Sequence, residues 1–132
     1  GGPSRRAPAL ALFAIVFVWQ PPHVWAVELF RKAEYAAAGL PTMPAALGDQ
    51  PTRRRILAWA LALVLVSLVP WAGGVLGPVY AAIALLAGGY FVWSIACALR
   101  ARAAHADRRV FTASLIYTTA LFLEMLAELV LR

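Results

Sequence analysis

A short segment inside the first apolar run combines polar groups with two consecutive prolines. Residues 19–25 have the sequence WQPPHVW. Because proline has no backbone N–H, Pro21 and Pro22 predict an interruption of the helix that frees backbone carbonyls beside the polar pair Gln20 and His23. Such interruptions persist in lipid only where protein or trapped water satisfies the freed groups. The alternative is a simple kink near the membrane edge, with the flanking tryptophans as interfacial anchors.

Charged residues follow this segment and could bind a diphosphate with its magnesium ion. At about 100° per residue, four side chains fall within roughly a third of a helical circumference: Trp19, His23, Arg31 and Glu34. Arginine and lysine neutralise phosphate oxygens, and carboxylates hold a hard cation such as Mg²⁺. The residues that supply such groups are Arg31, Lys32, Glu34, Arg53, Arg54 and Arg55. The alternative is that these basic residues only flank membrane helices on the cytoplasmic side, and that Glu34 is solvated.

Two acids lie in the last apolar run. Glu124 and Glu128 are four residues apart, on one face of a helix. An unpaired acid deep in a bilayer costs about 2.5–3.5 kcal/mol on insertion scales. We therefore expect Glu124 to face the interior of a helical bundle, where either polar packing or a function would explain it.

The elements that must position these residues are membrane helices. The chain is 63% hydrophobic and 14% charged, whereas soluble domains are about 45–50% apolar and about 25% charged. A bilayer core of about 30 Å needs about 20 consecutive apolar residues per helix. Four such spans are predicted, at about 7–30, 56–76, 79–99 and 110–131. Because open sheets cannot cross lipid, residues 1–132 are predicted to form one all-α membrane domain of about four transmembrane helices.

The distribution of charge predicts how the helices are oriented. The formal net charge is +6, and nine of the twelve basic residues lie in two loops, at about 31–55 and 100–109. A hairpin rich in glycine and proline separates the second and third spans, so both loops fall on one side, and the positive-inside bias makes that side cytoplasmic. We therefore predict a multi-pass protein whose surroundings are the lipid bilayer and not nucleic acid. Thr52 and Asp107 are placed to cap the helices that follow them.

Several catalytic signatures are absent from the sequence. It contains no GxSxG, CxxC or HExxH motif, no Walker loop and no dinucleotide-binding glycine fingerprint. Hydrolase, redox and nucleotide-driven functions therefore lose support. The residues alone indicate a helical membrane protein with a candidate anion and metal site at its cytoplasmic face.

The sequence resembles a known family of membrane enzymes. The segment WQPPHVW is similar to the W-x-x-P-H-F-W segment of the protoheme IX farnesyltransferases (heme O synthases), a family within the UbiA superfamily of intramembrane prenyltransferases. Val24 and Glu34 stand where that family usually has Phe and Asp, and Thr42-Met43 where it has Met-Leu. The residues that resemble its D-Y-x-x-A-G-x-P-M-L-P…G…T…I stretch are Tyr35, Gly39, Pro41, Pro44, Gly48, Thr52 and Ile56.

The resemblance implies an activity and a set of site residues. The activity is transfer of a farnesyl group from farnesyl diphosphate to a vinyl group of protoheme IX (heme b), which forms heme O, with Mg²⁺ assisting the departure of diphosphate. It implies catalytic roles for His23, Glu34 and Tyr35, with Glu34 as a magnesium ligand. It implies a protein of the cell (inner) membrane, with heme A synthase or oxidase assembly factors as further partners. The substrate-binding residues that it implies are Trp19, Arg31, Lys32, Arg53 and Arg54.

The resemblance covers only part of the family's complete enzymes. These have further spans and an Asn/Asp-rich motif that binds metal and diphosphate in their N-terminal half, and no such motif occurs in this sequence. The chain therefore resembles the C-terminal part of such an enzyme, which would hold half an active site and be inactive alone. One alternative is a UbiA-type prenyltransferase acting on a quinone precursor or other aromatic acceptor, which would need a second aspartate-rich motif. The other alternative is a non-catalytic membrane assembly protein.

Overall fold

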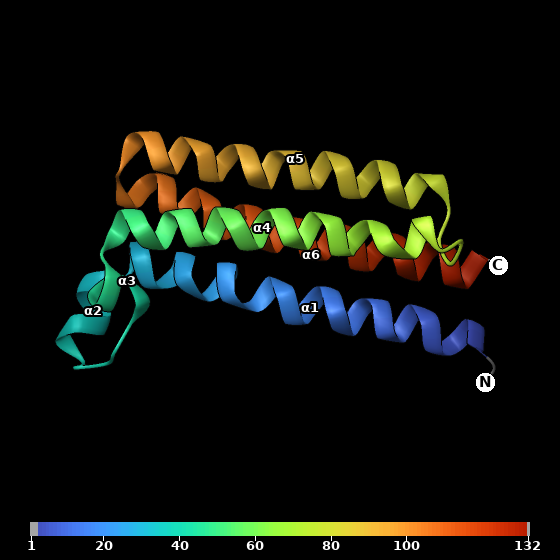
Figure 1. Cartoon of the computed structure of the whole chain (residues 1–132), viewed down its shortest axis with the longest axis horizontal. Coiled ribbons are helices and arrows are strands. Elements are labelled where there is room, and N and C mark those ends of the chain that lie inside the picture. The colour runs from blue at the N-terminus through green and yellow to red at the C-terminus, as the bar shows by residue number, and fades with distance from the viewer. Residues whose placement is uncertain (1–2, 132) are drawn as a thin grey trace.

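The computed structural model describes residues 3–131, and over this range the chain is helical, with no strand (Figure 1). Four helices are long and apolar enough to cross a membrane. They contain 24 to 28 residues each, about 36–42 Å at 1.5 Å per residue, which exceeds the bilayer core of about 30 Å. The prediction of an all-α protein with about four transmembrane helices is confirmed. The long helices are α1 (Pro3–Phe30), α4 (Asp49–Ala72), α5 (Pro78–Ala101) and α6 (Ala104–Leu131).

These helices form an up-and-down bundle. Helix α1 packs on α4 and α6, and α5 packs on the same two helices from the other side. Two short helices, α2 (Lys32–Ala37) and α3 (Met43–Leu47), lie at the same end of the bundle as the turn between α5 and α6 (Figure 1). The α4–α5 loop lies at the opposite end. We call the first end the basic end, because it carries Arg31, Lys32, Arg53, Arg54, Arg55, Arg100, Arg102, Arg108 and Arg109.

Helix α1 does not break at its prolines. It runs from Pro3 to Phe30 with Pro8, Pro21 and Pro22 inside it, so the predicted interruption is wrong. Neighbouring helices can hold such a helix together, and Pro22 is fully buried between them. The carbonyls of Phe17 and Val18, four residues before Pro21 and Pro22, still lack their usual helical donors.

The loop after α1 is more structured than the sequence indicates. The chain leaves helical geometry at Arg31, which has a non-helical φ of −109°, and α2 starts afresh at Lys32 within the predicted loop. Gly39 then ends this segment with a φ of +71°, the left-handed conformation that glycine adopts at helix ends. Thr42 caps α3 by accepting a hydrogen bond from the backbone N–H of Ala45, at 3.2 Å.

Three polar side chains in the bundle core are paired across helices. The Tyr80 hydroxyl of α5 donates to the carbonyl of Ser67 in α4 at 2.6 Å. The Tyr117 hydroxyl of α6 donates to the Ser67 hydroxyl, which in turn donates to the carbonyl of Leu63 at 2.7 Å. The Tyr80, Tyr117 and Ser67 side chains are fully buried. The network joins α4, α5 and α6 in a region where water is not available to satisfy these groups.

The acids of α6 face the start of α5. The Glu128 carboxylate accepts a hydrogen bond from the backbone N–H of Gly77, the residue that precedes α5. Glu124 and Glu128 are both half-buried and line a cavity of about 890 Å³ between α5 and α6. Glu128 therefore caps α5 from a neighbouring helix, and Glu124 lies between helices as expected for an acid in a membrane protein.

A buried ion pair closes the basic end. Arg53 of α4 binds Asp107 of α6 through two parallel hydrogen bonds of 2.8 and 2.7 Å, and the two side chains are only 5% and 2% exposed. Arg53 also donates to Gln50 at 3.0 Å, and Gln50 donates to the carbonyl of Leu99 in α5 at 2.7 Å. Three helices are thus tied together by one polar network.

The two predicted helix caps, Thr52 and Asp107, do not act as caps. Asp107 lies in the first turn of α6, which begins at Ala104, and its carboxylate binds Arg53. Thr52 lies inside α4, which begins at Asp49, and its hydroxyl donates to the carbonyl of Gly48 at 2.7 Å. Both helices begin before the residues that the sequence marks as their starts.

Removing one member of the ion pair should destabilise the bundle strongly. Arg53→Met leaves Asp107 buried without a partner, and we expect a loss of about 3–5 kcal/mol in the free energy of unfolding. Arg53→Met combined with Asp107→Leu should recover most of this loss, because the pair is then replaced by apolar packing. Unfolding by SDS in mixed micelles, followed by circular dichroism, measures the effect. Arg54→Met, at an exposed neighbour, is the matched control, and equal losses for Arg53→Met and Arg54→Met would contradict the assignment.

Candidate functional site

A row of aromatic rings runs along the contact between α1 and α6. The Trp19 ring stacks on the His23 ring with centroids 4.2 Å apart, and His23 lies 4.9 Å from Phe111 of α6. Phe111 lies 5.3 Å from Phe30, at the end of α1. All four side chains are half-buried. We call Trp19, His23, Phe111 and Phe30 the aromatic row. It leads from the middle of the bundle to the basic end.

Ser114 of α6 fixes both polar groups of the row. The indole N–H of Trp19 donates to the carbonyl of Ser114 at 2.9 Å, and Nδ1 of His23 lies 2.9 Å from the Ser114 hydroxyl oxygen. That hydroxyl donates its own hydrogen to the carbonyl of Phe111 at 2.6 Å. Nδ1 of His23 is therefore the donor to Ser114, and Nε2 of the neutral ring carries a lone pair. None of the described residues hydrogen-bonds Nε2.

Two arginines flank the ring at the end of the row. The guanidinium of Arg31 lies 5.5 Å from the centroid of Phe30, and that of Arg108, from α6, lies 6.0 Å from the same centroid. Both side chains are exposed. Arg31 also pairs with Glu34 at 3.3 Å, but these side chains are 52% and 70% exposed, so solvent screens the pair. Two cations beside one aromatic ring form a place where an anionic group could bind, adjoining an apolar surface.

The predicted site residues divide into three groups. Trp19 and His23 lie together in the aromatic row, and Arg31 lies at its end. Lys32 binds Asp49 at 2.6 Å, Glu34 binds Arg31, and Tyr35 is half-buried in α2. Arg53 is committed to Asp107 and is not free to bind a phosphate, whereas Arg54 is exposed at the start of α4.

The carboxylates at the basic end do not make a metal site. Glu28 accepts a hydrogen bond from the backbone N–H of Met43 at 2.9 Å. Glu34, Asp49 and Asp107 each bind a basic side chain. Within the part of the chain that the structure describes, no three His, Cys, Asp or Glu side chains lie close enough together to hold a metal ion. A hard divalent cation needs several oxygen ligands at once, so these residues do not fit a magnesium site by themselves.

Sequence reasoning missed the contribution of α6. Arg108, Phe111 and Ser114 follow one another at intervals of three residues, which places them on neighbouring positions of one helix face. In the sequence, however, Arg108 is one of several loop arginines, and Ser114 is an isolated small residue in an apolar run. The partners of Ser114 come from α1, 95 and 91 residues away in the chain, so no local pattern could reveal the pairing.

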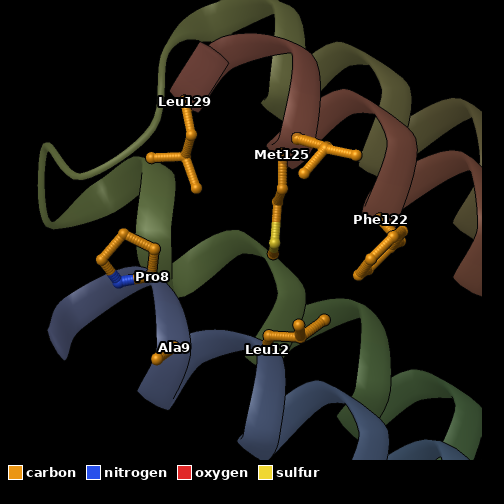
Figure 2. A pocket seen from close by; sticks show the side chains of 7 residues that line it. Pro8, Ala9, Leu12, Phe122, Met125 and Leu129 are labelled. Carbon is orange, nitrogen blue, oxygen red and sulfur yellow. The ribbon is translucent and has the colours of Figure 1, made fainter. Parts of the chain in front are cut away.

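The same pair of helices also encloses an apolar groove at the opposite end of the bundle. Figure 2 shows Pro8, Ala9 and Leu12 of α1 facing Phe122, Met125 and Leu129 of α6 across this groove, whose volume is about 420 Å³. No titratable side chain lines it. It can accommodate apolar groups, but it supplies no group for chemistry, and the candidate site is therefore the aromatic row with Arg31 and Arg108.

Comparison with known proteins gives a consistent family. Residues 4–123 match the UbiA prenyltransferase family. The chain is 42% identical over 93% of its length to a protoheme IX farnesyltransferase of Bradyrhizobium diazoefficiens. It is 40% identical over 96% and 95% of its length to proteins of the same name from Rhodopseudomonas palustris and Bordetella pertussis. The chain spans less than half the length of these relatives, at 40%, 42% and 42%. No solved structure matches it significantly.

The hydrogen bond between Ser114 and His23 should contribute measurably to stability. Ser114→Ala removes the partner of the half-buried Nδ1–H, and we expect a loss of about 1–2 kcal/mol in the free energy of unfolding. Ser94→Ala is the matched control. Ser94 is also fully buried and also donates to the carbonyl three residues earlier, but no other described side chain hydrogen-bonds it. Its loss should be within about 0.5 kcal/mol. Equal losses in SDS titrations would show that Ser114 does not anchor His23.

Proposed function

The chain belongs to the UbiA prenyltransferase family, and from this premise we propose that it is the C-terminal part of a protoheme IX farnesyltransferase. The complete enzyme would transfer a farnesyl group from farnesyl diphosphate to a vinyl group of heme b to form heme O. The names of the relatives support this proposal. Their greater length supports the view that these residues form only part of the active site.

The observation that carries the proposal is the aromatic row with two arginines at its end. Arg31 and Arg108 would bind the diphosphate, and their charges would stabilise the negative charge that develops on it as the bond to farnesyl C1 breaks. The row from Arg31 back to Trp19 covers about 18 Å by helical rise. Its rings would line the allylic chain and exclude water from the allylic cation. The terminal vinyl carbon of heme b would then bond to C1, and water would add to the cation left on the inner vinyl carbon, with loss of a proton, to form the hydroxyl group of heme O.

His23 is proposed to act through its free nitrogen. The bond to Ser114 holds the ring with Nε2 directed away from the hydroxyl. The lone pair of Nε2 is then available to accept a hydrogen bond from the heme substrate or to coordinate its iron. Lys32, Glu34, Tyr35 and Arg54 remain proposed contacts at the diphosphate end, because they lie at the basic end of the bundle. Arg53 is proposed instead to position α6, because its guanidinium is occupied by Asp107.

Magnesium would shield the charge of the departing diphosphate. Since the carboxylates of residues 3–131 do not gather into a site, we propose that its ligands come mainly from the part of the relatives outside the matched region. The chain alone is therefore proposed to be inactive. We also propose that the protein lies in the cell (inner) membrane with its basic end in the cytoplasm, which is the orientation favoured by nine basic residues at that end.

His23 provides the test of this function in the complete protein. We expect His23→Ala to reduce heme O formation at least about tenfold, because a contact to the substrate and a stacked ring are lost together, while protein abundance falls much less. Heme extraction and chromatography from cells that express the complete gene measure heme O, and immunoblotting measures abundance. Leu65→Ala, at an exposed position of α4 that faces away from both the aromatic row and its partners, is the control and should leave both unchanged.

Two outcomes would contradict the proposal. Equal losses of heme O and of protein in His23→Ala would mean that His23 only holds the helices together. If the unmodified complete protein is present at normal abundance but forms no heme O, the proposed farnesyltransferase activity is excluded. A prenylated quinone precursor in its place would indicate a related prenyltransferase, and no prenylated product at all would favour a non-catalytic assembly protein.

A further inference from the structure

One face of α1 is exposed from Leu10 to Val24. It carries large apolar side chains at alternating intervals of three and four residues, with Gln20 in the same series. This spacing matches the repeat with which a helix packs along a second helix. The face lies opposite the side that packs on α4 and α6, because Pro22 and Ala26 of that side are buried. We call this face the outer stripe; its members are Leu10, Phe13, Phe17, Gln20 and Val24.

Gln20 is a poor residue for a face that meets lipid. Its side chain is exposed, and no described residue hydrogen-bonds its amide. It lies about 16 Å from Arg31 and about 21 Å from Arg6 by helical rise, which places it near the middle of the span from Arg6 to Phe30. Burying an amide in hydrocarbon without a partner costs about 2–7 kcal/mol, whereas glutamine commonly hydrogen-bonds between membrane helices.

A backbone acceptor lies on the same face. The carbonyl of Phe17 would normally accept a hydrogen bond from residue 21, but Pro21 has no N–H to donate. Phe17 is 65% exposed, so no helix of the bundle covers this position. A carbonyl that lacks its usual helical donor gains from a partner in lipid for the same reason as the amide of Gln20. The outer stripe therefore presents the Gln20 amide next to a backbone carbonyl whose usual donor is missing.

The exposed apolar faces of α4 and α5 differ from this stripe. On α4, Trp59 packs edge-on against Trp25 of α1, and the large exposed apolar side chains begin only after it. They carry no amide, acid or base, and neither do those in the middle of α5, so both faces suit lipid. The exposed side chains are Leu61, Leu65, Val69 and Trp71 on α4, and Leu85, Leu86, Tyr90 and Trp93 on α5.

We propose that the outer stripe docks a further transmembrane helix, one that belongs to the part of the relatives outside the matched region and carries a hydrogen-bonding side chain opposite Gln20. This rests on the proposed function, in which the chain is part of a longer enzyme. The matched region is 40% of the relative from Bradyrhizobium diazoefficiens, so the remainder, about 60% of that protein, lies outside it. A helix on the outer stripe would satisfy Gln20 and the Phe17 carbonyl together and would cover the exposed phenylalanines.

A second copy of the chain fits the stripe less well. Arg31 continues the spacing of Leu10, Phe17 and Val24 by seven residues, so two α1 helices packed in parallel along this stripe would bring their Arg31 side chains together. Like charges that face each other are destabilising. A helix from another part of the protein is not bound by this symmetry.

Photo-crosslinking in the complete protein tests the docking. Benzoylphenylalanine is placed at position 17 of the outer stripe or at position 65 of α4, where Phe17 and Leu65 are 65% and 69% exposed. After irradiation of membranes, mass spectrometry maps the adducts. We expect position 17 to crosslink within the same polypeptide to a segment outside residues 1–132, and position 65 to give no such adduct. Gln20→Leu should lower the yield at position 17 about three- to tenfold, as expected for loss of an interhelical hydrogen bond, and Gln20→Asn should restore part of it.

Four outcomes would overturn the proposal: adducts of position 17 with lipid alone, adducts between two copies, equal yields at positions 17 and 65, or a yield that Gln20→Leu leaves unchanged. The readout does not depend on activity. A protein that gives the expected adduct but no heme O would refute the proposed function and keep the docking surface. A protein that makes heme O but gives no such adduct would support the proposed function and refute the docking surface.

Discussion

The ion pair between Arg53 and Asp107 is the interaction on which the basic end of the bundle depends. It joins α4 to α6 through two hydrogen bonds in a place that solvent hardly reaches, and Gln50 extends it to α5. With Asp107 held toward α4, the rotation of about 100° per residue turns Phe111 and Arg108 toward α1. The pair therefore sets the rotation of α6 that completes the aromatic row, although no hydrogen bond joins its members to the row.

The same constraint explains the other polar contacts of the bundle. In hydrocarbon a polar group must find its partner within the protein, and several of these partnerships join different helices. Ser67 joins Tyr80 and Tyr117, Ser114 joins Trp19 and His23, and Glu128 joins Gly77. The outer stripe of α1 departs from this pattern on an exposed face, because the Gln20 amide has no hydrogen-bond partner within residues 3–131 and the Phe17 carbonyl lacks its usual helical donor. The departure is what distinguishes that stripe from the apolar outer faces of α4 and α5.

The sequence was sufficient for the class of fold and for part of the site. Apolar runs of membrane length predict the four helices, and helical spacing predicts that Trp19 and His23 share a face, where they stack at 4.2 Å. The roles of Arg53 and Asp107 could not be predicted, because each residue is explained by a partner 54 positions away. The prolines were misjudged for a related reason, since packing by neighbouring helices keeps α1 intact.

Diphosphate binding at the end of the aromatic row, between α1 and α6, is the central claim of the proposed function. The most direct measurement is the KM for farnesyl diphosphate of the complete protein carrying Arg108→Gln. Loss of one charge-assisted contact of about 1.5–3 kcal/mol predicts a KM raised roughly ten- to a hundredfold, with little change for Arg100→Gln, an exposed arginine at the end of α5. Equal and small changes for both variants would contradict this binding site.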